Sequence, residues 1–285
     1  NISPKKHTVQ IETAGASKEY RFEVTPPKGS STGIFSALVN EDKETYNMSL
    51  EEIDYPHIDK QYLLSPNKAI ASKIALKTKV KKIAYLKGAG DKVAESLRNI
   101  GIEVTEFDVD GLRLENLLDF PTLVVGIRAF NIHKSLAFKN QILWDYVEQG
   151  GTVVVQYNTS RGLDPSIMAP YPLILSRDRV TDENAPVQFL QKKHHLLNQP
   201  NTITEEDFKG WVQERGLYFA TSWDKRYQPL FSMNDKGEVP KLGSLLVTDY
   251  GKGKFIFTGL SFFRELPAGV PGAYRLFVNL ISYGK

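Results

Sequence analysis

Cysteine is absent from all 285 residues of the chain. Its absence excludes disulfide bonds, thiolate metal sites and a cysteine nucleophile. Long apolar runs are missing as well, since none reaches the roughly 20 residues that a membrane helix needs. The five histidines form neither an H-E-x-x-H motif nor a cluster with carboxylates. We therefore expect no membrane span, no metal and no cofactor.

A strong charge of one sign is also missing. The formal net charge is only +3, and the chain is 41% hydrophobic and 24% charged, as in an ordinary globular protein. Basic residues are dispersed apart from the run "KTKVKK" at 77–82, which we interpret as a solvated linker leading into a strand. This distribution leaves little footprint for nucleic acid, so we expect no nucleic-acid partner.

The first 78 residues read as short strands separated by turn residues. The strand-like runs are 7–13, 18–26, 33–40, 45–55 and 69–78, and "AGAS", "PPKGSSTG" and "NED" lie between them. This pattern predicts a small immunoglobulin-like β-sandwich over residues 1–78. The runs are fewer than the roughly seven strands of such a domain. We therefore expect a truncated sandwich and a chain that is part of a longer protein.

Residues 79–285 show a different pattern, in which apolar strands alternate with amphipathic helices. Expected strands lie within 81–90, 102–108, 121–130 and 152–158, expected helices within 91–101, 135–151 and 272–284, and a hairpin spans 244–260. Fully apolar strands that alternate with helices indicate a parallel sheet covered on both faces. The sequence therefore predicts an α/β domain with a mostly parallel sheet over residues 79–285.

Two short segments allow a functional and a structural interpretation. "GAGDKV" at 88–93 lies between a strand and a helix, as a dinucleotide-binding turn does, but Val93 replaces the third glycine. We favour a tight turn in which Asp91 caps the helix. "SRDRVTDENAPV" at 176–187 offers three acids to a metal, but its interleaved arginines favour a salt-bridge network.

A third segment, "FKGWVQERGLYF" at 208–219, combines aromatic and charged residues. An exposed Trp211 beside Glu214 and Arg215 would suit a sugar or a protein partner. Core packing is the interpretation that we favour for Trp211.

Polar side chains follow several strands of the predicted sheet. Ligands of open α/β sheets bind at the carboxyl ends of the strands, so these side chains are candidates for one pocket. The candidates are Arg128, Asn131, Tyr157, Asn158, Arg161, Arg264 and Glu265. Arg and Asn would bind hydroxyls or a carboxylate, Tyr157 would stack on the ligand, and Glu265 would hold Arg264 or accept from a hydroxyl. The alternative is a set of loops whose polar side chains only cap turns.

The segment "GLSFFRE" at 259–265 resembles the G-x-x-F-H-P-E motif of class I glutamine amidotransferases. The resemblance implies a flavodoxin-like sheet from residue 79 onward. It places the family's nucleophile near Tyr157 or Asn158 and its catalytic histidine at Phe263, leaving only Glu265 in common. Without a cysteine or this histidine, thioester glutaminase chemistry is not possible.

A second resemblance covers nearly the whole chain. The segments that carry it are "YPHI" (55–58), "GAGD" (88–91), "VVGIRAFN" (124–131), "VVQYNTSRG" (154–162), "SRDRVTDENAPV" (176–187), "GWVQERGLYF" (210–219) and "GLSFFRELPAGVPGAYRLF" (259–277). They resemble the C-terminal region of bacterial proteins of the LmbE-like, PIG-L deacetylase family. The resemblance implies an N-terminal zinc deacetylase domain with an A-H-P-D-D motif, which this sequence lacks.

These resemblances lead to three hypotheses. In the first, the chain is a non-catalytic accessory region that binds a glycan or a partner for an N-acetyl-sugar deacetylase. In the second, it is a hydrolase in which Glu265 acts as general base and Arg128 or Arg161 stabilises an oxyanion. In the third, the polar strand ends face the missing deacetylase domain. The resemblance also implies a periplasmic or secreted location, although the chain has no signal-peptide pattern.

Overall fold

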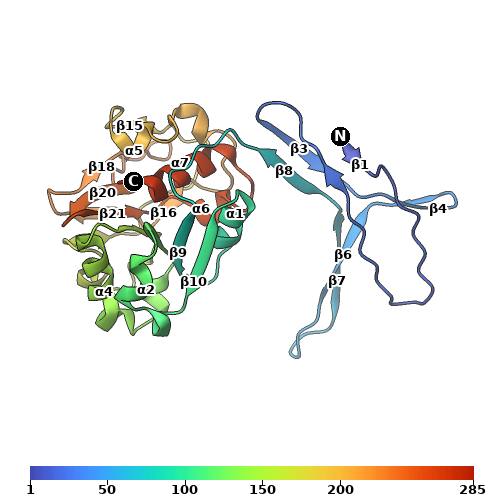
Figure 1. The fold of residues 1–285 in the computed structure, drawn as a ribbon, viewed down its shortest axis with the longest axis horizontal. Helices are drawn as coiled ribbons and strands as arrows, with labels where there is room; N and C mark the ends of the chain where they lie inside the picture. The colour runs from blue at the N-terminus through green and yellow to red at the C-terminus, as the bar shows by residue number, and fades with distance from the viewer. The chain divides into compact units, whose positions relative to one another are not determined.

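The computed structural model describes residues 1–285 and divides into two compact units, Asn1–Ala75 and Leu76–Lys285 (Figure 1). Every buried hydrophobic residue lies in the second unit, from Val80 onward. None of the helices is both long and apolar enough to cross a membrane.

The second unit is built on a seven-stranded sheet in the order β10-β9-β11-β12-β21-β20-β18. The strands from β10 to β21 run parallel, and β20 and β18 extend the sheet antiparallel at one edge. Their bounds are β9 Lys82–Leu86, β10 Glu103–Phe107, β11 Thr122–Val125, β12 Thr152–Val155, β18 Gln228–Pro229, β20 Leu245–Tyr250 and β21 Gly253–Thr258. The predicted α/β class with a mostly parallel sheet is therefore confirmed.

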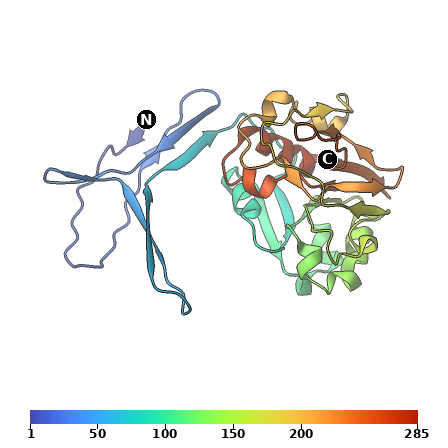
Figure 2. The same ribbon diagram turned by 180° about the vertical axis from the view of Figure 1, so that it is seen from behind.

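The central strands are uninterrupted apolar runs because helices cover both faces of the sheet. Every residue of β11 ("TLVV") and β12 ("TVVV") is buried. Helices α2 (Leu114–Leu118) and α4 (Leu136–Glu148) pack on one face, and α7 (Pro271–Ser282) packs on the other. Figures 1 and 2 show this layering, with α2 and α4 in green and α7 in red. The hydroxyl of Thr122 donates to the carbonyl of Ile281 at 2.6 Å and ties β11 to α7.

Shorter elements complete the second unit. The helices are α1 Val93–Asn99, α3 Ala129–Ile132, α5 His195–Asn198 and α6 Phe262–Glu265, with 3-10 turns η1 Val109–Gly111, η2 Pro165–Ile167 and η3 Glu205–Phe208. Two-stranded ladders join β13 Leu173–Leu175 to β17 Ala220–Trp223, β14 Arg179–Val180 to β16 Gly216–Leu217, and β15 Gln188–Phe189 to β19 Phe231–Ser232. These ladders fill the long connection between β12 and β20, where the sequence showed no periodic pattern.

The first unit consists of four separate two-stranded antiparallel ladders. They pair β1 Ile2–Ser3 with β2 Glu23–Val24, β3 Ser31–Phe35 with β8 Ala69–Lys73, β4 Val39–Glu41 with β5 Glu44–Tyr46, and β6 Met48–Ile53 with β7 Gln61–Pro66. The strand expected at 7–13 does not form, which corrects that prediction. No residue of this unit is buried, so the structure does not confirm the packed sandwich expected for residues 1–78.

Candidate functional site

The carboxyl ends of β11, β12 and β21 bring three of the predicted residues together. Arg128 follows β11, and its backbone N–H donates to the Tyr157 carbonyl, which follows β12, at 2.8 Å. Arg264 lies in α6, which begins soon after β21. Burial raises the pKa of the Tyr157 hydroxyl, and the charges of Arg128 and Arg264 oppose this rise without cancelling it. The parallel register of the three strands therefore brings Tyr157 close enough to Arg128 and Arg264 for both charges to act on its hydroxyl.

Aromatic rings surround Tyr157 at this point. Its ring stacks on that of Tyr218 with centroids 6.2 Å apart and meets the ring of Phe263 at 5.0 Å. Tyr157 is 8% exposed, whereas Tyr218 and Phe263 are half-buried, so the two outer rings present the apolar surface to solvent. We call the group formed by Arg128, Tyr157, Tyr218, Phe263 and Arg264 the strand-end surface.

The two arginines of the strand-end surface differ in how they are held. Arg264 lies over the Phe263 ring at 4.8 Å, donates to the Gln213 side chain and has its Nε 3.2 Å from a carboxylate oxygen of the buried Glu214. Glu214 also pairs with Arg179 at 2.7 Å. The Arg128 side chain is exposed and makes no hydrogen bond or ion pair within the chain. Arg264 is therefore a fixed guanidinium, and Arg128 is available to an anion.

The backbone around this surface contains uncommon conformations. Arg128 has a φ of 55°, Tyr218 of 53° and Gln213 of 71°, and these are the non-glycine residues of the second unit in the left-handed region. Such conformations cost about 1–3 kcal/mol each and persist where the surroundings impose them, often at functional sites. Two of the three residues belong to the strand-end surface, and the third accepts from Arg264.

The two predicted asparagines serve the backbone rather than a ligand. The Asn131 amide donates to the Thr159 carbonyl at 3.0 Å and accepts from the Thr159 N–H at 2.8 Å. Asn158 accepts from the Phe130 N–H at 3.1 Å and donates to the Gln156 carbonyl at 3.0 Å. Both side chains thus tie α3, which follows Arg128, to the loop after β12, next to the backbone bond between Arg128 and Tyr157.

The side chains of Arg161 and Glu265 make no hydrogen bond or ion pair with the strand-end surface. Arg161 is exposed in the loop after β12 and has no partner within the chain. Glu265 is fully buried, and its two carboxylate oxygens accept from the Val212 N–H at 2.9 Å and the Ser261 hydroxyl at 3.2 Å. Both oxygens of Glu265 therefore point into the protein, and Arg264 pairs with Glu214 instead.

Burial raises the pKa of Glu265 from 4.5 to about 7. The Val212 N–H, the Ser261 hydroxyl and the charges of Arg215 and Arg264 oppose this rise without cancelling it. Arg215 is buried as well, with its guanidinium donating to the carbonyls of Ala185 and Phe208, and burial lowers its pKa. A carboxyl group with a pKa near neutrality is suited to proton transfer, but this one lacks access to solvent.

The "GAGD" turn forms a partly buried group of polar contacts around Asp91. The Tyr85 hydroxyl donates to the Asp91 carboxylate, at 2.7 and 2.8 Å from its two oxygens, and the Gln156 amide donates to the Tyr85 hydroxyl at 3.1 Å. Asp91 also accepts from the N–H groups of Val93, the first residue of α1, and Ile127. A carboxylate thus occupies the place at the helix N-terminus where a nucleotide phosphate would bind.

The acidic segment 176–187 does not form the predicted salt-bridge network. Arg179 pairs with Glu214 rather than with the neighbouring acids, and Asp182 accepts from the Asn184 N–H. Asp182 and Glu183 instead act electrostatically on the buried Arg215. No group of three His, Asp or Glu side chains is arranged to hold a metal ion. Trp211 is 3% exposed, which confirms its place in the core.

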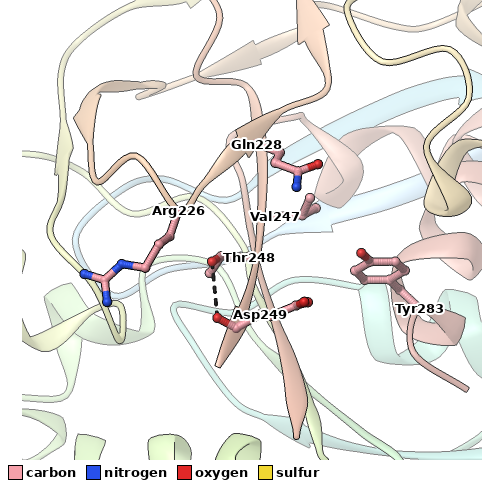
Figure 3. Close-up of a pocket in the computed structure, with 6 residues that line it drawn as sticks. All are labelled: Arg226, Gln228, Val247, Thr248, Asp249 and Tyr283. Carbon is pink, nitrogen blue, oxygen red and sulfur yellow. Dashed lines mark hydrogen bonds between the residues drawn. The ribbon is translucent and has the colours of Figure 1, made fainter. Parts of the chain in front are cut away.

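Sequence reasoning missed two features. Tyr218 reaches the strand-end surface because β16, directly before it, contacts the residues after β21, where the Leu217 N–H donates to the Gly259 carbonyl at 2.9 Å. A strand of two residues leaves no periodic signal in the sequence. A cavity of about 300 Å³ lies at the antiparallel edge of the sheet, lined by Arg226, Gln228, Val247, Thr248, Asp249 and Tyr283 (Figure 3). The sequence pointed to the carboxyl ends of the parallel strands, and this cavity lies elsewhere.

Comparisons with known proteins return distant structural similarities. No protein-family model matches the chain, and no curated protein matches its sequence. A cytoplasmic protein from Salmonella typhimurium is 10% identical with a TM-score of 0.45, over 88% of this chain and 95% of its own. A Thermoplasma acidophilum protein described as one subunit of GMP synthase is 10% identical with a TM-score of 0.45, over 71% of this chain and 94% of its own. A β-galactosidase from Rahnella sp. R3 is 14% identical with a TM-score of 0.42, over 72% of this chain and 32% of its own.

Proposed function

We propose that the chain is a non-catalytic accessory region of an LmbE-like (PIG-L) N-acetyl-sugar deacetylase and that its strand-end surface binds carbohydrate. The observation that carries this proposal is the arrangement of the surface. Two half-buried rings, Tyr218 and Phe263, flank Tyr157, and the charge of the exposed, unpaired Arg128 acts on the Tyr157 hydroxyl. Aromatic rings pack on the apolar faces of sugars, and guanidinium groups bind their hydroxyls and carboxylates.

We also propose a more specific fold for each unit, which rests on the sequence resemblances. The second unit is a flavodoxin-like domain related to class I glutamine amidotransferases, and residues 1–78 belong to an immunoglobulin-like sandwich. The resemblance places the nucleophile near Tyr157 or Asn158 and the histidine at Phe263, and the ring centroids of Tyr157 and Phe263 lie 5.0 Å apart. An aromatic contact in place of a catalytic pair supports a binding role. The same resemblance leads us to propose a periplasmic or secreted location and the deacetylase domain as a partner.

A second candidate function is a hydrolase that uses Glu265 as general base, with Arg128 or Arg161 stabilising an oxyanion. The pKa of about 7 on Glu265 favours it. Its full burial and the bonds to both of its oxygens oppose it, because a base must reach the proton that it removes. The binding module is therefore the function that we retain.

The experiment that tests the proposal is a calorimetric and thermal-shift titration of the full chain. The probes are N-acetylated chitooligosaccharides, their deacetylated forms and an oligouronate. A ligand that binds only the folded state raises the melting temperature. We expect Arg128→Ala and Phe263→Ala each to weaken binding at least about tenfold, because each removes a group that would touch the ligand.

Arg177→Ala serves as the matched control. Arg177 is an exposed arginine that has no partner within the chain and does not belong to the strand-end surface. Arg161→Ala tests whether the loop after β12 takes part in ligand binding. Binding that survives both Arg128→Ala and Phe263→Ala, or no binding of any probe, would contradict the proposal. Hydrolysis of a probe that Glu265→Gln abolishes would favour the second candidate.

A further inference from the structure

The cavity at the antiparallel edge of the sheet is a concave site at the opposite end of the strands from the strand-end surface. Tyr283, at the end of α7, accepts through its carbonyl from the hydroxyl of Thr152, the first residue of β12. Tyr157 follows the last residue of that strand. The cavity measures about 300 Å³ and draws its walls from β18, β20 and the end of α7. It therefore cannot share a ligand with the strand-end surface.

Two polar side chains of the cavity, from different strands, extend to the same side of β20. Figure 3 shows Gln228 of β18 and Asp249 of β20 extending toward the side of β20 where Tyr283 lies, while Arg226 extends to the other side. The Gln228 amide makes no hydrogen bond within the chain, and one oxygen of Asp249 is also without a partner. One amide and one carboxylate oxygen are thus free to bind a ligand between β20 and α7.

The charges in this cavity are neutralised by neighbours. Asp249 pairs with Lys254 at 2.5 Å, and Arg226 forms two bonds with the Asp224 carboxylate at 2.7 and 2.9 Å. Because each charge has its counter-charge in place, the cavity offers no net charge to a ligand. An anion or a cation would have to displace one of these pairs, whereas a neutral polar molecule would not.

Tyr283 supplies a hydrogen-bond donor to the cavity, while its ring is partly covered by the ammonium of Lys254, 5.3 Å from the ring centroid. The Nδ1 atom of His194 accepts from the Leu196 N–H at 3.2 Å, so the ring hydrogen lies on Nε2, which faces the Tyr283 hydroxyl at 3.4 Å. Burial, together with the charges of His195 and Lys254, lowers the pKa of His194, which keeps this neutral form. With His194 as donor, the Tyr283 hydroxyl retains its own hydrogen for a ligand.

We propose that this cavity binds a neutral monosaccharide unit, held by Gln228, Asp249 and Tyr283. A pyranose presents hydroxyls that bind amide, carboxylate and phenol groups. The volume lies at the small end of ligand pockets, which suits one sugar ring rather than a longer segment. This site and its neutral ligand are independent of the carbohydrate binding proposed at the strand-end surface.

The test is saturation-transfer NMR and calorimetry on the full chain with methyl glucoside, N-acetylglucosamine and glucuronate as probes. We expect the two neutral sugars to bind and glucuronate to bind at least about fivefold more weakly. Gln228→Ala, an exposed position, should weaken the neutral sugars about five- to tenfold through the loss of its hydrogen bonds. Tyr283→Phe should weaken them less than Tyr283→Ala, because it keeps the ring.

A charge change provides a readout that misfolding cannot imitate. Asp249→Asn leaves Lys254 without its partner, so the cavity becomes positive and glucuronate should gain affinity relative to methyl glucoside. Arg177→Ala, which changes a residue of neither site, is the control and should leave neutral-sugar binding unchanged. The proposal is overturned if neither neutral sugar binds, if Gln228→Ala and Tyr283→Ala have no effect, or if Arg128→Ala alone removes binding. That last result would assign the sugar to the strand-end surface and leave the proposed function standing.

Discussion

The most unusual residue of the second unit is Glu265, a carboxyl group with no exposure and a pKa near 7. Its folded pKa is raised above the unfolded value of 4.5, so the folded state binds more protons between these two values. The stability from this group is therefore fully present below pH 4.5 and is lost as the pH rises through about 7. The total loss is about 3 kcal/mol for a shift of this size.

Replacing Glu265 by glutamine should remove this pH dependence. The amide oxygen can still accept from the Val212 N–H, while the charge that burial penalises is gone. We expect Glu265→Gln to raise the free energy of unfolding by about 2–3 kcal/mol at pH 8 and to change it little at pH 4.5. Urea titrations at both values measure the effect, with the exposed Glu103→Gln as control. Equal effects at the two pH values would show that Glu265 does not titrate near 7.

Substitutions at Arg128 test whether the left-handed backbone at this position of the strand-end surface persists in solution. A φ of 55° costs conformational free energy for a residue with a side chain, whereas glycine adopts this conformation readily. We expect Arg128→Gly to be more stable than Arg128→Ala by about 1 kcal/mol, although both variants lose the guanidinium. Chemical denaturation of the two variants gives the comparison. If they are equally stable, the position is not left-handed in solution.

At the scale of elements, the sequence predicted the regular parts of the second unit and missed the parts that depend on single contacts. Apolar runs such as "TLVV" and "TVVV" identify buried strands because only a strand covered on both faces has no polar side. Asn131 and Asn158 were expected to face a ligand, but an asparagine after a strand can serve a loop equally well. Glu265 was expected in the pocket, but the turn of α6 directs it inward.

The packing of α7 on η3 depends on a glycine. A Cβ atom at Gly272 would lie 1.9 Å from the Asp207 carbonyl oxygen, so helix and turn could not approach as they do. The same contact holds Arg275 against Asp207 at 2.7 Å and lets the Trp211 indole donate to the Asp207 carbonyl at 2.9 Å. The close approach at Gly272 therefore supports an ion pair and a buried tryptophan.

Gly272→Ala should separate α7 from η3 and destabilise the second unit. We expect a loss of at least about 1–3 kcal/mol, the usual cost of forcing extra volume into a packed site. Gly111→Ala is the matched control, because a Cβ there meets nothing within 4 Å, and it should be neutral or slightly stabilising. Thermal unfolding followed by tryptophan fluorescence reports the difference. Equal melting temperatures for the two variants would mean that η3 moves away without cost.

At the scale of the whole molecule, the two units differ in how they are stabilised. The second unit contains every buried hydrophobic residue, and the first has none. In the β6–β7 ladder, Met48, Leu50, Tyr62 and Leu64 share one face and remain 48%, 63%, 60% and 62% exposed. Isolated two-stranded ladders are marginal in water, so the first unit has little stability of its own. The sequence showed its strand pattern but not whether a second layer covers it.

A matched pair of leucine substitutions measures this difference within one chain. Leu123 in β11 is fully buried, whereas Leu64 in β7 is 62% exposed. We expect Leu123→Ala to cost about 2–5 kcal/mol, since it opens a cavity in the core, and Leu64→Ala to stay within about 0.5 kcal/mol. Hydrogen exchange of the parent chain should show weak protection for 1–75 and strong protection for β9, β11 and β12. A cost above about 1 kcal/mol for Leu64→Ala, with protected amides in the β6–β7 ladder, would mean that another surface covers this face in solution.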